Sequence, residues 1–134
     1  MDKPKIRSID HIVMQVADLQ ETVKFYTEIL GMTHIEFYPP SGGSPRQSLN
    51  FGAQNINLHH AETPFVPHAR NPAVGSVDLC FITECLLVDW LHHLASSGID
   101  IEHGPVRKTG ASGLLSSIYI RDPDGNLIEI SNYV

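Results

Sequence analysis

The sequence of 134 residues has no excess of basic side chains, no long apolar run and only two cysteines. Its formal net charge of -6 excludes the strongly basic surface that is typical of nucleic-acid-binding proteins and of proteins on anionic membranes. No segment approaches the ~20 continuous apolar residues of a membrane-spanning helix, and no signal-type apolar stretch follows Met1–Lys5. We therefore expect a cytoplasmic protein that binds neither nucleic acid nor membranes.

The two cysteines and the glycine-rich segment match no cofactor-binding motif. Cys80 and Cys85 have neither a zinc-binding nor a redox spacing. Cys80 lies in the apolar run Val77–Ile82, which predicts a reduced cysteine in the core. The segment Ser41–Pro45 lacks the lysine and the hydroxyl residue of a phosphate-binding loop.

The periodicity of the apolar residues predicts the same order of elements twice. Strands are predicted over 6–16, 32–38, 47–51, 55–60, 75–83, 99–103, 115–121 and 127–131, helices over 19–30 and 86–97, a loop over 104–113 and a tight turn over 122–125. Asp18 and Glu21 form a predicted capping box at the start of the first helix. Gly31 and Gly98 are predicted to end the two helices.

The spacing of corresponding residues indicates an internal repeat. Sixty-seven residues separate His11 from Asp78, and the same number separates Gly31 from Gly98. The sequence therefore predicts an α+β fold of one domain, residues 1–134, in which two βαβββ modules form a curved mixed-sheet cup. Module one is predicted at about 6–61 and module two at about 75–134, and a proline-containing crossover at about 62–74 joins them.

Four polar residues interrupt apolar strands at repeat-equivalent positions: His11 and Asp78 on the first strands, Asn57 and Glu129 on the last. Since alternate side chains of a strand share a face, these four point away from the apolar face that packs under the helices. A pseudo-twofold arrangement brings the polar faces toward one point, where imidazole and carboxylate groups suit a divalent Mn, Fe, Ni, Co or Zn ion. Taken singly, each residue is also explained as a locally hydrogen-bonded or solvated strand residue, so the metal site depends on their joint placement.

Two motifs at these positions resemble a known superfamily. The segment Asp10–Leu19, followed by Phe25-Tyr26 and Ile29–Met32, resembles the opening of a vicinal oxygen chelate protein. The segment Asp122–Glu129 resembles the closing motif of that superfamily, which includes glyoxalase I, bleomycin-resistance proteins, fosfomycin-resistance enzymes and extradiol dioxygenases. Within the superfamily the chain is most similar to glyoxalase domain-containing proteins of the fifth type, which adds the matches Asn57-Leu58-His59, Asp78-Leu79-Cys80 and Gly110-Ala111.

The resemblance implies a paired βαβββ fold in which a divalent metal chelates two vicinal oxygens of a small substrate. It implies His11 and Glu129 as metal ligands, with Glu129 also as a catalytic residue. Asp78 stands where most active relatives have a histidine and is the expected third ligand. Asn57 stands at the position of a fourth-strand glutamate and cannot act as a base. His59 shares its face and is the expected fourth ligand or catalytic base.

The resemblance also suggests how a substrate and a partner are bound. Arg107 and Lys108 lie in a basic segment of an acidic protein and are candidates to bind an anionic group, such as a glutathione carboxylate or a phosphonate. A solvated hairpin loop explains the same two residues without any ligand. Arg46 is a lesser candidate of the same kind. Small chains of this superfamily commonly pair, so we expect a homodimer in which the partner chain can complete the cup.

Two functions of different classes remain open. The first is a divalent-metal-dependent, glyoxalase-like enzyme with lyase, isomerase or thiol-transfer chemistry on a small oxygen-chelating substrate, for example a glutathione adduct. The alternative is a small-molecule-binding protein that resembles the bleomycin-resistance proteins and performs no catalysis. An extradiol-type dioxygenase is a third possibility, but Asp78 departs from the two histidines and one glutamate typical of such enzymes. Metal analysis of the purified protein separates the first two functions.

Overall fold

The computed structural model describes residues 3–134. Met1 and Asp2 lie outside the described residues. The first two residues of the predicted domain, and of the segment in which a signal sequence was sought, therefore lie outside them as well. In chain order the elements are β1 (His11–Val16), α1 (Leu19–Lys24), η1 (Phe25–Ile29), β2 (Thr33–Phe37), β3 (Arg46–Phe51), β4 (Gln54–His60), β5 (Asp78–Ile82), α2 (Leu87–Ser96), β6 (His103–Thr109), β7 (Leu114–Arg121) and β8 (Leu127–Tyr133).

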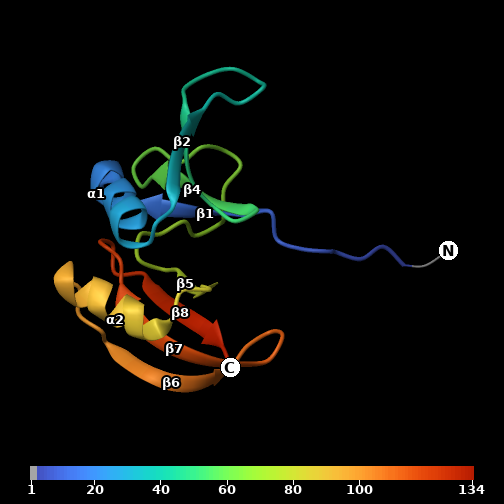
Figure 1. Ribbon diagram of the computed structural model, residues 1–134. Helices are drawn as coiled ribbons and strands as arrows, with labels where there is room; N and C mark the ends of the chain where they lie inside the picture. Colours follow the sequence, from blue (N-terminus) through green and yellow to red (C-terminus); the bar gives the residue numbers. More distant parts are fainter. Residues whose placement is uncertain (1–2) are drawn as a thin grey trace.

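Each half of the chain forms its own four-stranded mixed sheet, and Figure 1 shows the two sheets one above the other. The strand order is β1-β4-β3-β2 in module one and β5-β8-β7-β6 in module two. In both modules the first strand runs parallel to the last, and the other neighbouring strands are antiparallel. The predicted α+β fold of two βαβββ modules is therefore confirmed. Within residues 3–134, no helix is long and apolar enough to cross a membrane.

The strand register reproduces the repeat that the sequence predicts. Val13 lies opposite Asn57 in module one, and Cys80 lies opposite Glu129 in module two. Cys80 follows Val13 by 67 residues, which is also the spacing of His11 and Asp78. The parallel strand pairs of the two modules thus have corresponding registers.

One buried core receives apolar side chains from both sheets and from the helical segments. Met14 and Val16 of β1, and Ile56 and Leu58 of β4, are at most 2% exposed. The alternate side chains of each strand point the other way. We call the face of each sheet that is turned away from this core the open face of that module. The polar strand residues that the sequence predicts as site residues lie on the open faces.

A buried polar network fastens the two modules together. Asp122, which begins the turn between β7 and β8, accepts a hydrogen bond of 2.7 Å from the Tyr26 hydroxyl of module one. The Asn126 side chain donates to the same carboxylate at 2.8 Å, and the backbone N–H groups of Asp124 and Asn126 also donate hydrogen bonds to it. Burial and the adjacent carboxylate raise the pKa of Tyr26, so the hydroxyl remains a donor. The predicted turn over 122–125 is confirmed by a hydrogen bond from Gly125 to Asp122.

The predicted glycines at the helix ends and the Asp18 half of the predicted capping box are present. The Asp18 side chain caps α1 by accepting from the backbone N–H of Glu21 at 3.1 Å. Gly31 and Gly98 follow the helices with φ values of 75° and 73°, a conformation that favours glycine. The first helix nevertheless changes type at Phe25, where the π-helical turn η1 begins.

The prediction that the first strand begins at Ile6 is wrong. The strand β1 begins at His11, and the preceding segment includes Ile6 and Ile9, which are 91% and 64% exposed. The pairing of β1 with β4 starts at His11 and Asn55. The end of this segment reaches β4, where the Gln54 side chain donates to the Ile9 carbonyl at 3.0 Å and the Asn55 backbone N–H donates to the Asp10 carbonyl at 3.4 Å. The paired register nevertheless starts at His11, and a segment without a paired strand is not itself a strand.

The predicted strand over 99–103 and loop over 104–113 are also wrong. The strand β6 runs from His103 to Thr109 and pairs with β7, and only a short connection around Gly110 and Gly113 joins the two. The register shifts between His103 and Val106, so the strand accommodates Gly104 and Pro105 as a bulge. Glycine and proline there had indicated a loop.

Candidate functional site

The open face of module two presents Glu129 at its centre. Tyr119 of β7 and Cys80 of β5 lie opposite Glu129 in register. Ser131 donates weakly to the Glu129 carboxylate at 3.4 Å and is within 2.6 Å of Ser117 through the hydroxyl oxygens. Burial, then hydrogen bonding to Glu129 and its negative charge, raises the pKa of Tyr119 to about 12. A hollow of about 360 Å³ is lined by Cys80, Ile82, Lys108, Thr109, Gly110, Ala111, Leu115, Glu129 and Tyr133.

In the part of the chain that the structure describes, Glu129 has no cationic partner. Within residues 3–134, no Lys, Arg or His nitrogen lies within 4.0 Å of its carboxylate, and the ion pairs are His11 with Asp10 and Arg121 with Glu102. The side chain is nevertheless only partly exposed. A partly desolvated carboxylate with only neutral donors around it is able to receive a cation from outside the chain.

The prediction that Cys80 is a core residue is wrong. Cys80 is an exposed free thiol on the open face, whereas its neighbours Leu79 and Phe81 pack against the core. The run Val77–Ile82 is apolar at every position except 78, so its composition concealed the alternation of the strand. The Cys80 thiol lies 3.4 Å from the Ser131 hydroxyl, and partial desolvation raises the pKa of this thiol although the residue remains accessible.

The predicted substrate-binding residues Arg107 and Lys108 lie on the strand β6, not on a flexible loop. Lys108 lines the hollow that contains Glu129, and its ammonium lies 5.8 Å from the centre of the Tyr119 ring. Arg107 is exposed and, as the neighbouring strand residue, points to the opposite face. Of these two residues, only Lys108 is therefore positioned to meet a molecule bound beside Glu129.

The open face of module one presents His11 at the start of β1. The side chain is 46% exposed, and its Nδ1 atom lies 2.8 Å from the Asp10 carboxylate. Asn57 accepts a hydrogen bond of 2.6 Å from Asn55, the register partner of His11. A hollow of about 240 Å³ lies between the modules, lined by Ile9, His11, Ile12, Phe51, Gln54, Asn55, Ile56, Leu79, Cys80 and Phe81.

His59 occupies a more enclosed position on the same open face. It is only 6% exposed, and its ring packs edge-on against Phe65 of the crossover with 5.2 Å between ring centres. Burial, followed by the positive charge of Arg46 and that of His68, lowers the pKa of His59. A neutral imidazole beside a guanidinium is the result. His60 points away and is exposed, as the alternation predicts.

A single chain does not assemble the predicted ligand set. Across residues 3–134, no group of three or more His, Cys, Asp or Glu side chains is placed to hold one metal ion. His11 and Asp78 begin the first strands of two different sheets. Cys80 lines both the hollow of His11 and that of Glu129, so the two hollows adjoin without merging. The four predicted ligands therefore do not fit one ion within the chain.

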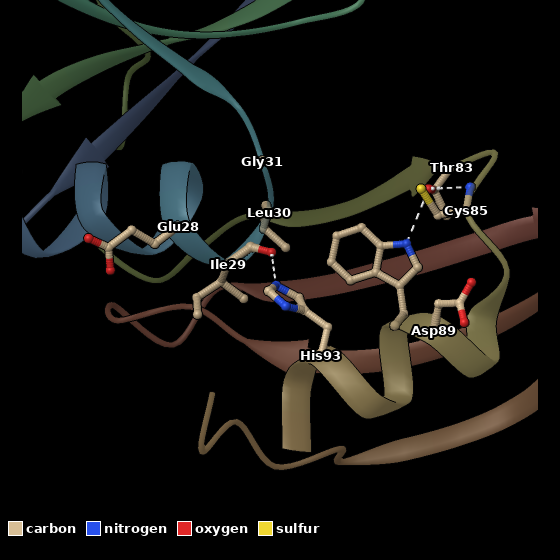
Figure 2. Close-up of a pocket in the computed structure, with 9 residues that line it drawn as sticks. Glu28, Ile29, Leu30, Gly31, Thr83, Cys85, Asp89 and His93 are labelled. Atoms are coloured by element: carbon tan, nitrogen blue, oxygen red, sulfur yellow. Dashed lines mark hydrogen bonds between the residues drawn. The ribbon is translucent and has the colours of Figure 1, made fainter. Parts of the chain in front are cut away.

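Sequence reasoning also missed a hollow of about 490 Å³ on the helical side of the junction between the modules. Figure 2 shows His93 of α2 directed at the Ile29 carbonyl at the end of η1, where the Nε2–O distance is 2.8 Å. Trp90 donates to the Thr83 hydroxyl at 3.2 Å in the same wall. The lining of this hollow comes from two segments far apart in the sequence, 28–31 and 83–93, so no local pattern could have indicated it.

Comparison with known proteins adds a family to this geometry. The family model of the Glyoxalase/Bleomycin resistance protein/Dioxygenase superfamily matches residues 8–130. The chain is 50% identical over 129 residues to the virulence protein STM3117 of Salmonella typhimurium, across 96% of this chain and 86% of that protein. A crystal structure of STM3117 aligns with a TM-score of 0.90 and 49% identity over 98% of this chain and all of that one.

Two further relatives span most of the chain. The glyoxalase domain-containing protein RDO1 of Mycosarcoma maydis is 46% identical over 128 residues, which are 96% of this chain and 69% of that protein. The structure of an integron cassette protein from V. cholerae is 47% identical and aligns with a TM-score of 0.92, over 99% of this chain and 100% of that one. These matches extend over both modules.

Proposed function

The chain belongs to the glyoxalase/bleomycin resistance protein/dioxygenase superfamily, and from this membership we propose that it is a divalent-metal-dependent, glyoxalase-like enzyme. Its substrate would be a small molecule with two adjacent oxygens, for example a glutathione adduct. We further propose that the metal site is shared by two chains of a homodimer, since one chain does not gather the ligands. His11 would come from one chain, and Asp78 and Glu129 from module two of its partner.

The observation that carries the proposal is the state of Glu129. This carboxylate is partly desolvated, lies at the centre of an open face, and has no cation within 4.0 Å in the described chain. A partly desolvated carboxylate is less stable without an opposite charge than with one. A bound divalent ion would provide that charge, and Asp78 of the same face would add a second oxygen ligand.

The surroundings of His11 support its role as the nitrogen ligand. Its Nδ1 atom is engaged by Asp10 at 2.8 Å, which leaves Nε2 free at an exposed position. Histidines that ligate metals commonly donate their other N–H to a carboxylate, which fixes the tautomer and the ring orientation. Asp10 would have this supporting function.

The chain's own residues would bind and orient the substrate around such a site. A divalent metal held there would act as a Lewis acid toward the two substrate oxygens. Tyr119 lies opposite Glu129 in register with its pKa raised to about 12, and its neutral hydroxyl can donate a hydrogen bond beside Glu129. Lys108 lines the hollow and can attract an anionic substrate. His59 lies beside a guanidinium, so we leave it out of the proposed metal set.

A second function is favoured by the apolar part of the same hollow. Ile82, Leu115 and Tyr133 line it next to Glu129, and they would hold an apolar small molecule without any metal. The chain would then be a binding protein of the bleomycin-resistance kind, in which Glu129 is a hydrogen-bond acceptor.

Metal analysis distinguishes the two functions. Purified dimer saturated with Mn, Fe, Co, Ni or Zn and then desalted should retain about one ion per chain, a stoichiometry expected for one site per module pair. Glu129→Gln should lose most of this metal, whereas Glu84→Gln, the same change at an exposed glutamate, should retain it. Failure of all five metals to bind, or equal retention by both variants, would refute the enzyme proposal.

A further inference from the structure

Three buried polar atoms without hydrogen-bond partners lie side by side on the open face of module one. They are Gln15 Oε1, His59 Nδ1 and Arg46 Nε. Gln15 and His59 are paired in the β1–β4 register. Arg46 precedes Gln47, the register partner of Leu58, and therefore lies next to His59 across the β3–β4 pair. Gln15 and His59 are only 7% and 6% exposed. We call these three residues the Arg46 row.

The positive charge in this row is uncompensated. Within the described residues, no carboxylate lies within 4.0 Å of the Arg46 guanidinium and no hydrogen bond engages it. The Phe65 ring instead stacks on it, with 3.6 Å from Cζ to the ring centre, and the same ring contacts His59. Stacking uses the face of the guanidinium and leaves its edge of N–H groups available.

We infer that the Arg46 row is a subsite for an anionic group, a carboxylate or a phosphate, of a bound small molecule. A guanidinium edge matches the paired oxygens of such groups. Neutral His59 supplies an N–H donor, and the Gln15 amide supplies either a donor or an acceptor according to its rotation. An anion there would accept hydrogen bonds from Arg46 Nε and His59 Nδ1, and from the Gln15 amide nitrogen once that amide is rotated, and it would neutralise Arg46.

The position of the row indicates the shape of the ligand, a step that rests on the proposed function. Gln15 follows His11 by four residues on β1, which corresponds to about 13 Å along the strand. A molecule that spans the distance from His11 to the anion subsite is therefore elongated. Its acidic group lies far from its oxygen-chelating end. A short peptide adduct has this form, whereas a two- or three-carbon carbonyl compound does not.

Anion binding can be measured on the metal-free protein, which makes the result independent of the proposed metal site. We would record the imidazole NMR signals of His59 while adding sodium phosphate or sodium acetate at constant ionic strength. Either anion should shift these signals saturably, and the anion that binds more tightly identifies the group. Arg46→Gln should weaken binding at least about tenfold, as expected for the loss of a charged hydrogen-bond pair.

The matched control is Arg70→Gln, which removes an exposed arginine of the crossover and should leave the affinity unchanged. Arg46→Lys keeps the charge without the planar edge, should bind with intermediate affinity, and replaces Arg46→Gln if that variant does not fold. No saturable shift with either anion, or equal affinity in wild type and Arg46→Gln, would show that the row holds only water. That result would leave the metal analysis of Glu129 unaffected.

Discussion

Burial and nearby positive charge determine the protonation of His59. Its ring is enclosed between Phe65 and the sheet, and the charged groups that act on it are Arg46 and His68. Both effects lower the pKa of His59, so the folded protein holds the imidazole neutral at pH values where an unfolded chain begins to protonate it.

We therefore predict that His59 makes the protein less stable in mild acid. As the pH falls below about 6.5, the unfolded chain takes up the His59 proton before the folded chain does, so the free energy of unfolding decreases. One such group changes it by at most about 1.4 kcal/mol per pH unit. Urea unfolding from pH 7.5 to 5 should show a shallower decline for His59→Gln, while exposed His92→Gln should parallel the wild type.

The variant must be compared with the wild type, because other groups also make the stability depend on pH. Burial raises the pKa of Asp124, for example, which changes stability with pH in the opposite direction. Parallel curves for His59→Gln and the wild type would contradict the prediction.

At the scale of the elements, two glycines of nearly equal conformation have different surroundings. Gly75, before β5, and Gly98, after α2, have φ values of 74° and 73°. A Cβ atom on Gly75 would lie 2.5 Å from the backbone oxygen of Asp124, whereas one on Gly98 would meet nothing within 4 Å. The first contact is with backbone and cannot be relieved by a side-chain rotation.

Alanine substitutions at these two positions should therefore distinguish the cost of backbone strain from the cost of a steric clash. Gly98→Ala should lower the free energy of unfolding by about 1–2 kcal/mol through its left-handed conformation alone. Gly75→Ala has the same strain, must also displace the turn that begins at Asp122, and should lose at least about 1 kcal/mol more. Thermal or urea unfolding measures the difference in the free energy of unfolding. Equal decreases for the two variants would mean that the turn at Asp122 moves aside without a measurable cost.

The elements that could be predicted from the sequence are those fixed by local chemistry. The Asp18 cap and the glycines at 31 and 98 act within a few residues, and each is present as predicted. The limits of a strand depend on its partner strand. The residue types at 6–10 and the glycine and proline of β6 therefore led to wrong predictions of where these strands begin and end. Pattern alone therefore gives the order of the elements better than their ends.

The candidate site divides in the same way. The open-face positions of His11 and Glu129 follow from alternation along single strands, and the structure places both there. The sequence marks Arg46 as a candidate for an anionic group. Its grouping with Gln15 and His59 could not be predicted, because the Arg46 row joins β1, β4 and β3 through their register and is covered by Phe65 of the crossover. The network of Tyr26 and Asp122 likewise depends on how the modules pack.

At the scale of the whole molecule, the junction between the modules separates the proposed ligands. The Tyr26–Asp122 hydrogen bond and the contact of His93 with the Ile29 carbonyl hold the modules together on the core side. His11 and Glu129 consequently line two adjoining hollows and not one. In a C2 dimer each open face can meet the other kind of open face, so two equivalent shared sites result.

A shared site predicts complementation between two inactive variants. In a heterodimer of His11→Gln and Glu129→Gln chains, one site carries both substitutions and the other carries neither. Heterodimers isolated through two different affinity tags should therefore hold about half the metal of the wild-type dimer. Each variant homodimer, with one ligand missing from both sites, should bind at least about tenfold more weakly.

The same heterodimer behaves differently if the ligands act within one chain. Each of its sites would then lack one ligand, and its metal content would equal that of the variant homodimers. A heterodimer of His92→Gln and Glu84→Gln chains, both changed at exposed positions outside the open faces, should bind metal fully and controls for tagging and exchange. Half occupancy beside full occupancy in this control requires that His11 and Glu129 of different chains meet at one ion.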